Sequence, residues 1–122
     1  MDSKQLQKIH ERLRIIQVAY SRIFVESVLD AKRFLEILEK NIILNEIPNP
    51  SDVIAEPDGT VCIEWMKYTK QGHLDIFSVY TIGDSTLFCE GFIESIGVNL
   101  KKTVDLKEDL DDTLLIYVKH FS

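Results

Sequence analysis

Residues 3–44 read SKQLQKIHERLRIIQVAYSRIFVESVLDAKRFLEILEKNIIL, a run that contains neither glycine nor proline. In its first half, apolar side chains recur at alternating steps of three and four residues, which is the spacing of one face of a helix. This periodicity predicts an amphipathic α-helix that begins near Ser3. The apolar face, here called the N-terminal stripe, consists of Leu6, Ile9, Leu13, Ile16, Tyr20 and Ile23.

The apolar register changes near the middle of this run. Ser27 and Asp30 occupy the next two positions of the N-terminal stripe, while a second apolar register begins at Phe24 and Val28. Such a shift indicates either a stutter within one helix or a boundary between two helices. Ser27 is a candidate N-cap for a second helix, but no glycine, proline or polar loop separates the two registers. We therefore expect one long helix that is bent or broken near residues 26–30.

The length of that helix bears on how the protein associates. A continuous helix over residues 3–44 would extend about 63 Å, whereas a compact chain of this size is only about 35 Å across. The N-terminal stripe would then project beyond the body, and exposed apolar surface of that extent usually marks an interface. A second copy or another protein would cover it; the alternative is that the helix breaks and folds back within one chain. We favour an interface, most simply a homodimer.

A small sheet is predicted after a proline-containing linker. Pro48, Pro50 and Pro57 lie in residues 46–59 and prevent helix continuation. Asp58-Gly59 then forms a turn, and alternating apolar residues predict three strands, over residues 60–68, 73–82 and 86–93. Three consecutive strands of this kind form an antiparallel meander. Residues 95–103 remain open between a loop and a short fourth strand.

A second helix is predicted to close the chain. Asp105 and Glu108 have the spacing of a capping box, in which each side chain bonds a free backbone N–H of the first turn. Acidic residues early and basic residues late also match the helix dipole. The predicted fold is therefore α+β: a long N-terminal helix, a three-stranded antiparallel meander and a C-terminal helix. Residues 1–122 form a single domain, with a helical segment over 1–45, a linker over 46–59, and a sheet plus helix over 60–122.

Charge argues against several classes of partner. The chain has 14 basic and 20 acidic residues, for a net charge of −6. Residues 46–122 carry 14 of the acidic residues and only 6 of the basic ones, and an acidic body repels nucleic-acid phosphates.

No apolar run approaches the length of a membrane span, and the N-terminus does not resemble a signal peptide. Two cysteines, Cys62 and Cys89, then predict free thiols in the cytoplasm.

Catalytic and metal-binding patterns are weak. His73 and Asp75 lie on one predicted strand, and Cys62 on its neighbour, so a cysteine-dependent enzyme is a minor alternative. No motif for an oxyanion site accompanies these residues, and a solvated strand edge accounts for them equally well. The sequence has no Cys-x-x-Cys, His-x-x-x-His or glycine-rich phosphate loop. We therefore predict no catalytic, cofactor-binding or metal-binding residue, no cofactor and no enzymatic activity.

One stretch resembles known proteins. Residues 57–65, PDGTVCIEW, are similar to a strand found in many small bacterial and phage proteins, most of them uncharacterised. The resemblance covers residues 57–80 and implies a bacterial or phage origin. It brings no catalytic residue with it.

These observations predict a non-enzymatic protein–protein interaction module that associates through its N-terminal stripe. The alternative is a small acidic inhibitor from a phage or mobile element, of the anti-CRISPR or antitoxin type. Such an inhibitor would place its acidic body in a basic groove on its target, with electrostatic attraction raising the association rate.

Overall fold

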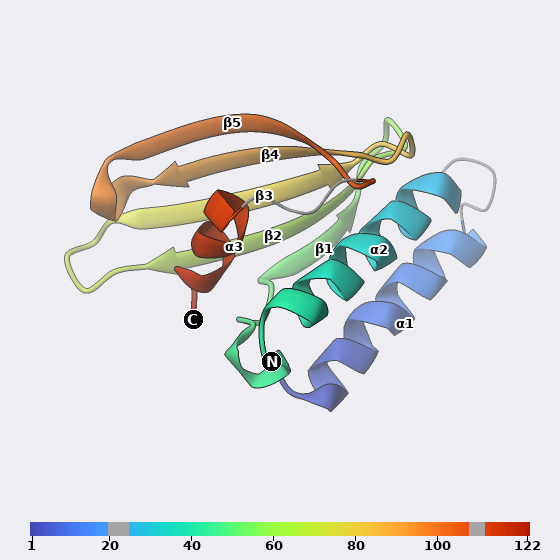
Figure 1. Cartoon of the computed structure of the whole chain (residues 1–122), viewed down its shortest axis with the longest axis horizontal. Helices are drawn as coiled ribbons and strands as arrows, with labels where there is room; N and C mark the ends of the chain where they lie inside the picture. Colours follow the sequence, from blue (N-terminus) through green and yellow to red (C-terminus); the bar gives the residue numbers. More distant parts are fainter. Residues whose placement is uncertain (20–24, 108–111) are drawn as a thin grey trace.

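The N-terminal segment forms two helices that lie side by side (Figure 1). The structure, a computed structural model, describes residues 1–19, 25–107 and 112–122. The first helix, α1, spans Ser3–Ala19, and the second, α2, spans Val25–Asn41. The prediction of one long helix is therefore wrong. The shift in apolar register marks a boundary between two helices, and α1 folds back to bury its apolar face against α2.

The predicted break near residues 26–30 is also misplaced, because these residues lie within α2. Ser27 is not an N-cap. It is buried, and its hydroxyl donates a hydrogen bond to the carbonyl oxygen of Gly59 at 2.8 Å. The polar side chain that interrupts the N-terminal stripe thus attaches α2 to the sheet.

The sheet has five antiparallel strands in the order β1-β2-β3-β4-β5, so the predicted three-stranded meander is wrong. Three strands, β2 (Val61–Tyr68), β3 (Leu74–Thr81) and β4 (Thr86–Ile93), lie where the sequence predicts them. The first strand, β1 (Asp52–Ala55), falls inside the predicted linker. Prolines stand before and after β1 but not within it, so its backbone donors remain able to pair with β2. The last strand, β5 (Val98–Asp105), occupies the segment that the sequence left open.

The C-terminal helix begins later than the capping box predicts. Asp105 is the last residue of β5, and its carboxylate accepts a hydrogen bond from the Lys107 backbone N–H at 2.8 Å, closing a local turn. The helix itself, α3, spans Asp112–Lys119. Glu108, the other half of the predicted capping box, lies outside the described residues.

The described helices cover one face of the sheet and leave the other face open (Figure 1). On the covered face, the Trp65 ring lies 6.3 Å from the Phe34 ring of α2 and 6.2 Å from the Phe77 ring of β3. The Phe77 ring in turn stacks on Tyr117 of α3 at 5.9 Å. The Trp65 indole N–H donates to the Pro48 carbonyl oxygen at 2.9 Å. This aromatic cluster holds α2 and α3 to the middle of the sheet.

Candidate functional site: the open face of the sheet

The described members of the N-terminal stripe are covered by the chain itself. Ile9, Leu13 and Ile16 are buried, and Leu6 is partly buried. Helix α1 contacts α2 and β1. Tyr20 and Ile23 lie outside the described residues. An interface was expected here because the stripe would project into solvent. Since α1 packs on α2 and β1 instead, that reason no longer applies.

The structure does not bring Cys62, His73 and Asp75 together. Cys62 faces the open side of the sheet and pairs in register with Tyr80, whereas Asp75 faces the helices. Burial, with the nearby charges of Glu64 and Glu56, raises the pKa of the Cys62 thiol to about 12. A thiol with that pKa stays protonated at neutral pH, which is unsuited to nucleophilic attack.

Asp75 has a structural role at the end of α3. Its side chain is fully buried and accepts hydrogen bonds from His120 Nε2 at 2.8 Å and from the Ser95 hydroxyl at 2.6 Å. Burial alone would raise the pKa of Asp75, but these hydrogen bonds, with one from the Ser95 backbone N–H, lower it to about 2. The Lys67 ammonium donates to the His120 carbonyl oxygen at 2.6 Å. Through these contacts the cluster attaches the residues after α3 to β3.

We define the open face as the side of the sheet opposite the helices. Its position follows from register, because residues paired across neighbouring strands point to the same side. Trp65, Phe77 and Gly91 are paired on the covered side. Side chains alternate along a strand, so the residues on either side of each of these three point away from the helices. The main members of the open face are Ile54, Cys62, Glu64, Met66, Ile76, Ser78, Tyr80, Phe88, Glu90, Phe92, Lys101 and Thr103.

Large apolar side chains on the open face are exposed. Phe92 is 48% exposed, Met66 is 43% exposed and Phe88 is 37% exposed. Ile76, which is partly buried, pairs with both Met66 and Phe92 in neighbouring strands. Contiguous exposed apolar surface on a folded protein is typical of a binding surface.

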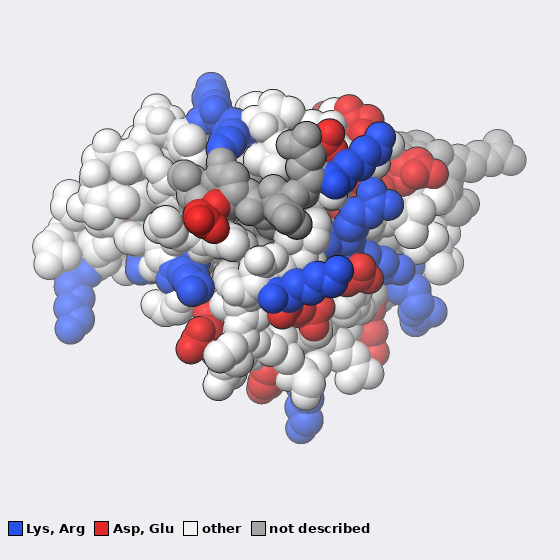
Figure 2. Space-filling model, viewed as in Figure 1, with Lys and Arg blue, Asp and Glu red and all other residues white. Residues whose placement is uncertain are grey.

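Carboxylates border these apolar side chains. Across the five strands, the acidic residues of the open face are Asp52, Glu64, Glu90 and Asp105, and the only basic one is Lys101. Asp52 and Glu64 are directly opposite each other on β1 and β2, and like charges in such a pair repel each other. Lys8 and Arg12 of α1 line a smaller hollow together with Asp52. By contrast, Figure 2 shows that the side bearing the helices has both signs of charge, with Lys and Arg gathered over α2. The open face is thus the more uniformly acidic side.

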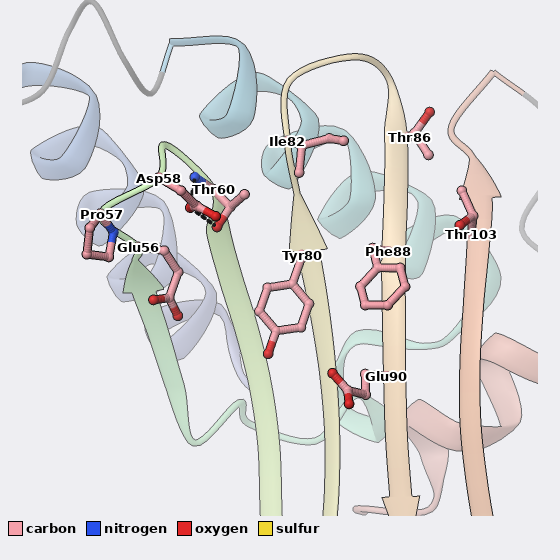
Figure 3. Close-up of a pocket in the computed structure, with 10 residues that line it drawn as sticks. All are labelled: Glu56, Pro57, Asp58, Thr60, Tyr80, Ile82, Thr86, Phe88, Glu90 and Thr103. Carbon is pink, nitrogen blue, oxygen red and sulfur yellow. Dashed lines mark hydrogen bonds between the residues drawn. The ribbon is translucent and has the colours of Figure 1, made fainter.

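A hollow of about 750 Å³ lies at the end of the open face where the β1–β2 and β3–β4 turns meet. Figure 3 shows the Tyr80 and Phe88 rings on neighbouring strands, with Glu90 next to them on β4 and Glu56 across β2. Its volume falls within the usual range of about 300–1,000 Å³ for ligand-binding pockets. The hollow combines aromatic rings with carboxylates, and such a lining favours a cationic ligand.

Neither a metal site nor a membrane span is found in the described part of the chain. Among residues 1–19, 25–107 and 112–122, no group of three His, Cys, Asp or Glu side chains is arranged to hold a metal ion. No helix in those residues has the length and apolar character needed to cross a bilayer.

Comparison with known proteins identifies no relative. No family model matches the chain, and no significant match is found among curated proteins or solved structures.

The sequence contains a signal for the open face in the alternation of its central strands. Strand β3 has apolar residues on both sides, with Ile76 and Tyr80 on one and Phe77 and Val79 on the other. Strand β4 likewise has Phe88 and Phe92 on one side and the buried Leu87 and Cys89 on the other. The three described α-helices cover only one of these sides. Apolar residues on both faces of a sheet that helices cover on one side predict apolar side chains that stay exposed on the other side.

Proposed function

We propose that this chain is a non-enzymatic protein-binding module whose open face binds a positively charged protein partner. The main observation behind the proposal is the open face itself, where Met66, Phe88 and Phe92 stay exposed within a border of carboxylates. The apolar side chains supply contact area, and the carboxylates select for a basic surface and raise the association rate. We place the protein in the cytoplasm, without a cofactor and without a nucleic-acid or membrane partner.

A second copy is a poorer occupant than a basic partner. Two open faces packed together would bring the Asp52, Glu64 and Glu90 carboxylates of one copy close to those of the other. Among the strand residues of each open face, only Lys101 carries a positive charge that could offset these carboxylates. Juxtaposed like charges at an interface cost several kcal/mol, so charge complementarity favours a different protein with Lys or Arg on its binding surface.

The carboxylates of the open face also support a second candidate, an inhibitor that occupies a basic groove made for nucleic acid. In this case the partner is an enzyme or toxin that acts on nucleic acid. The candidate adds one expectation: DNA or RNA competes with this protein for the partner, since both need the same basic groove.

The test immobilises three forms of the chain and compares the proteins that each form captures from a lysate of the native host. The face variant carries Met66→Ser and Phe92→Ser; the matched control carries Val18→Ser and Ile116→Ser, which replace exposed apolar residues on α1 and α3. We expect proteins that bind the unmodified chain and the control, but not the face variant, and that elute as salt is raised. The proposal would be contradicted if the face variant still bound the captured proteins. It would also be contradicted if the control lost them while the face variant kept them.

A further inference from the structure

The hollow at the turn end of the open face is lined by carboxylates, most of which have no hydrogen-bond donor in the described part of the chain. Three carboxylates line it, from Glu56 after β1, Asp58 in the β1–β2 turn and Glu90 on β4. Asp58 is already engaged, since Thr60 donates to it through its backbone N–H at 3.0 Å and its hydroxyl at 2.8 Å. Among the described residues, the carboxylates of Glu56 and Glu90 have neither a hydrogen bond nor an ion pair, although Lys101 on β5 is the register partner of Glu90.

Aromatic rings form the floor between these carboxylates. Tyr80 and Phe88 are paired in register, with ring centroids 6.1 Å apart and planes inclined at 43°. Figure 3 shows both rings on the side of the sheet that faces away from the helices. The face of an aromatic ring attracts a cation, and a planar guanidinium can also stack on it.

We infer that this hollow is the binding site for an arginine side chain, whose guanidinium stacks on Tyr80 and Phe88 between the free carboxylates of Glu56 and Glu90. The inference rests on the proposed function, because the arginine belongs to the basic surface of the protein partner. It adds the group that the partner must present and the place where that group binds.

Arginine fits this lining better than lysine does. Its five N–H donors lie in one plane and can reach carboxylates on two sides while the flat group covers a ring. A lysine ammonium is a compact point charge that is more strongly hydrated. The hollow also has room beyond the guanidinium for the flanking backbone of a peptide.

The test titrates ¹⁵N-labelled protein with the capped tripeptide Ac-Ala-Arg-Ala-NH₂ and follows backbone amide shifts. Two matched peptides replace arginine with citrulline, which has the same shape without the charge, and with lysine. We expect arginine-peptide shifts confined to the residues that line the hollow, with a Kd on the order of 1 mM. The lysine peptide binds more weakly, and the citrulline peptide produces no saturable shift.

Three variants separate charge from ring stacking. Glu56→Gln and Glu90→Gln each remove one free carboxylate without changing its shape, and each should weaken arginine-peptide binding roughly threefold to fivefold. Phe88→Leu keeps an apolar side chain but removes a ring, and should weaken binding by a similar factor. Glu36→Gln on the exposed surface of α2 is the control and leaves binding unchanged.

Equal binding of the arginine and citrulline peptides would overturn the inference, as would equal binding of the lysine peptide. Shifts centred on the helices, or an arginine peptide that does not bind, would overturn it too. None of these results depends on the capture experiment, which tests the proposed function through Met66 and Phe92. A failed arginine site and a failed open face are therefore distinguishable.

Discussion

Tyr80 and Phe88 lie next to each other on β3 and β4, with ring centroids 6.1 Å apart, and no described helix covers them. On the other side of the same two strands, Val79 and Cys89 are fully buried beneath the helices. The two faces of the sheet therefore have different roles. The covered face forms the core, and the open face exposes aromatic and acidic side chains, which in the proposed function bind a partner.

The helical hairpin predicts that the N-terminal stripe stabilises the monomer. Leu13 is fully buried, so Leu13→Ala should lower the free energy of unfolding by about 2–5 kcal/mol. Val18→Ala, at a position 71% exposed on the same helix, should change it by no more than about 0.5 kcal/mol. Urea denaturation followed by Trp65 fluorescence measures both. A midpoint that rises with protein concentration, or a Leu13→Ala variant as stable as the parent, would restore the stripe as an interface.

Contact between α2 and the β3–β4 turn predicts a difference between two glycines. Gly83 and Gly72 both have positive φ, at 89° and 83°, so alanine at either should cost about 1 kcal/mol through backbone strain. At Gly83 the added Cβ would also lie 2.8 Å from the Cβ of Glu26 in α2, whereas at Gly72 it meets nothing within 4 Å.

Thermal unfolding should therefore show Gly83→Ala to be clearly less stable than Gly72→Ala, because overpacking adds about 1–3 kcal/mol. Equal losses for the two variants would mean that α2 does not pack on this turn.

The Asp75 cluster predicts a pH-dependent contribution to stability. The pKa of Asp75 is about 2 in the folded chain, against an ordinary value of 3.8. A carboxyl whose folded pKa is depressed stabilises the fold above its unfolded pKa, and that contribution disappears as pH falls through the folded pKa. The stability advantage of the parent chain over Asp75→Asn should be full at neutral pH and shrink between about pH 4 and pH 2. Chemical denaturation of both chains across this range measures it; an advantage independent of pH would contradict the assignment.

Burial predicts that the cysteines are unreactive in the folded protein. The pKa values of the Cys62 and Cys89 thiols are both raised to about 12, chiefly by burial. A disulfide reagent at mildly alkaline pH should therefore label neither thiol in the folded chain and both in denaturant. Rapid labelling of Cys62 without denaturant would reopen the alternative of a cysteine-dependent enzyme.

Local sequence patterns were enough to predict the central strands but not their surroundings. The alternation of Val61, Ile63 and Trp65 is a local signal, and β2 forms where it predicts. Strand β1 is only four residues long and is specified by its pairing with β2, which no local pattern reveals. The boundary between α1 and α2 lacks glycine and proline, so only the shift in apolar register indicated it.

The candidate site was harder to predict for a related reason. The pattern on β3 and β4 shows apolar residues on both faces, but which face the helices would cover depends on tertiary packing. Glu56 and Glu90 are far apart in sequence and meet at the hollow only because of the strand register. The sequence drew attention instead to the N-terminal stripe, whose exposure depended on a helix too long for its domain.

Hydroxyl-radical footprinting of this chain, alone and bound to the captured partner, tests the role of the open face most directly. Oxidation of Met66, Phe88 and Phe92 should fall on binding, while oxidation of the exposed Val18 and Ile116 on the helical side should stay the same. Unchanged oxidation of the open face, with protection of the helical side, would contradict that role.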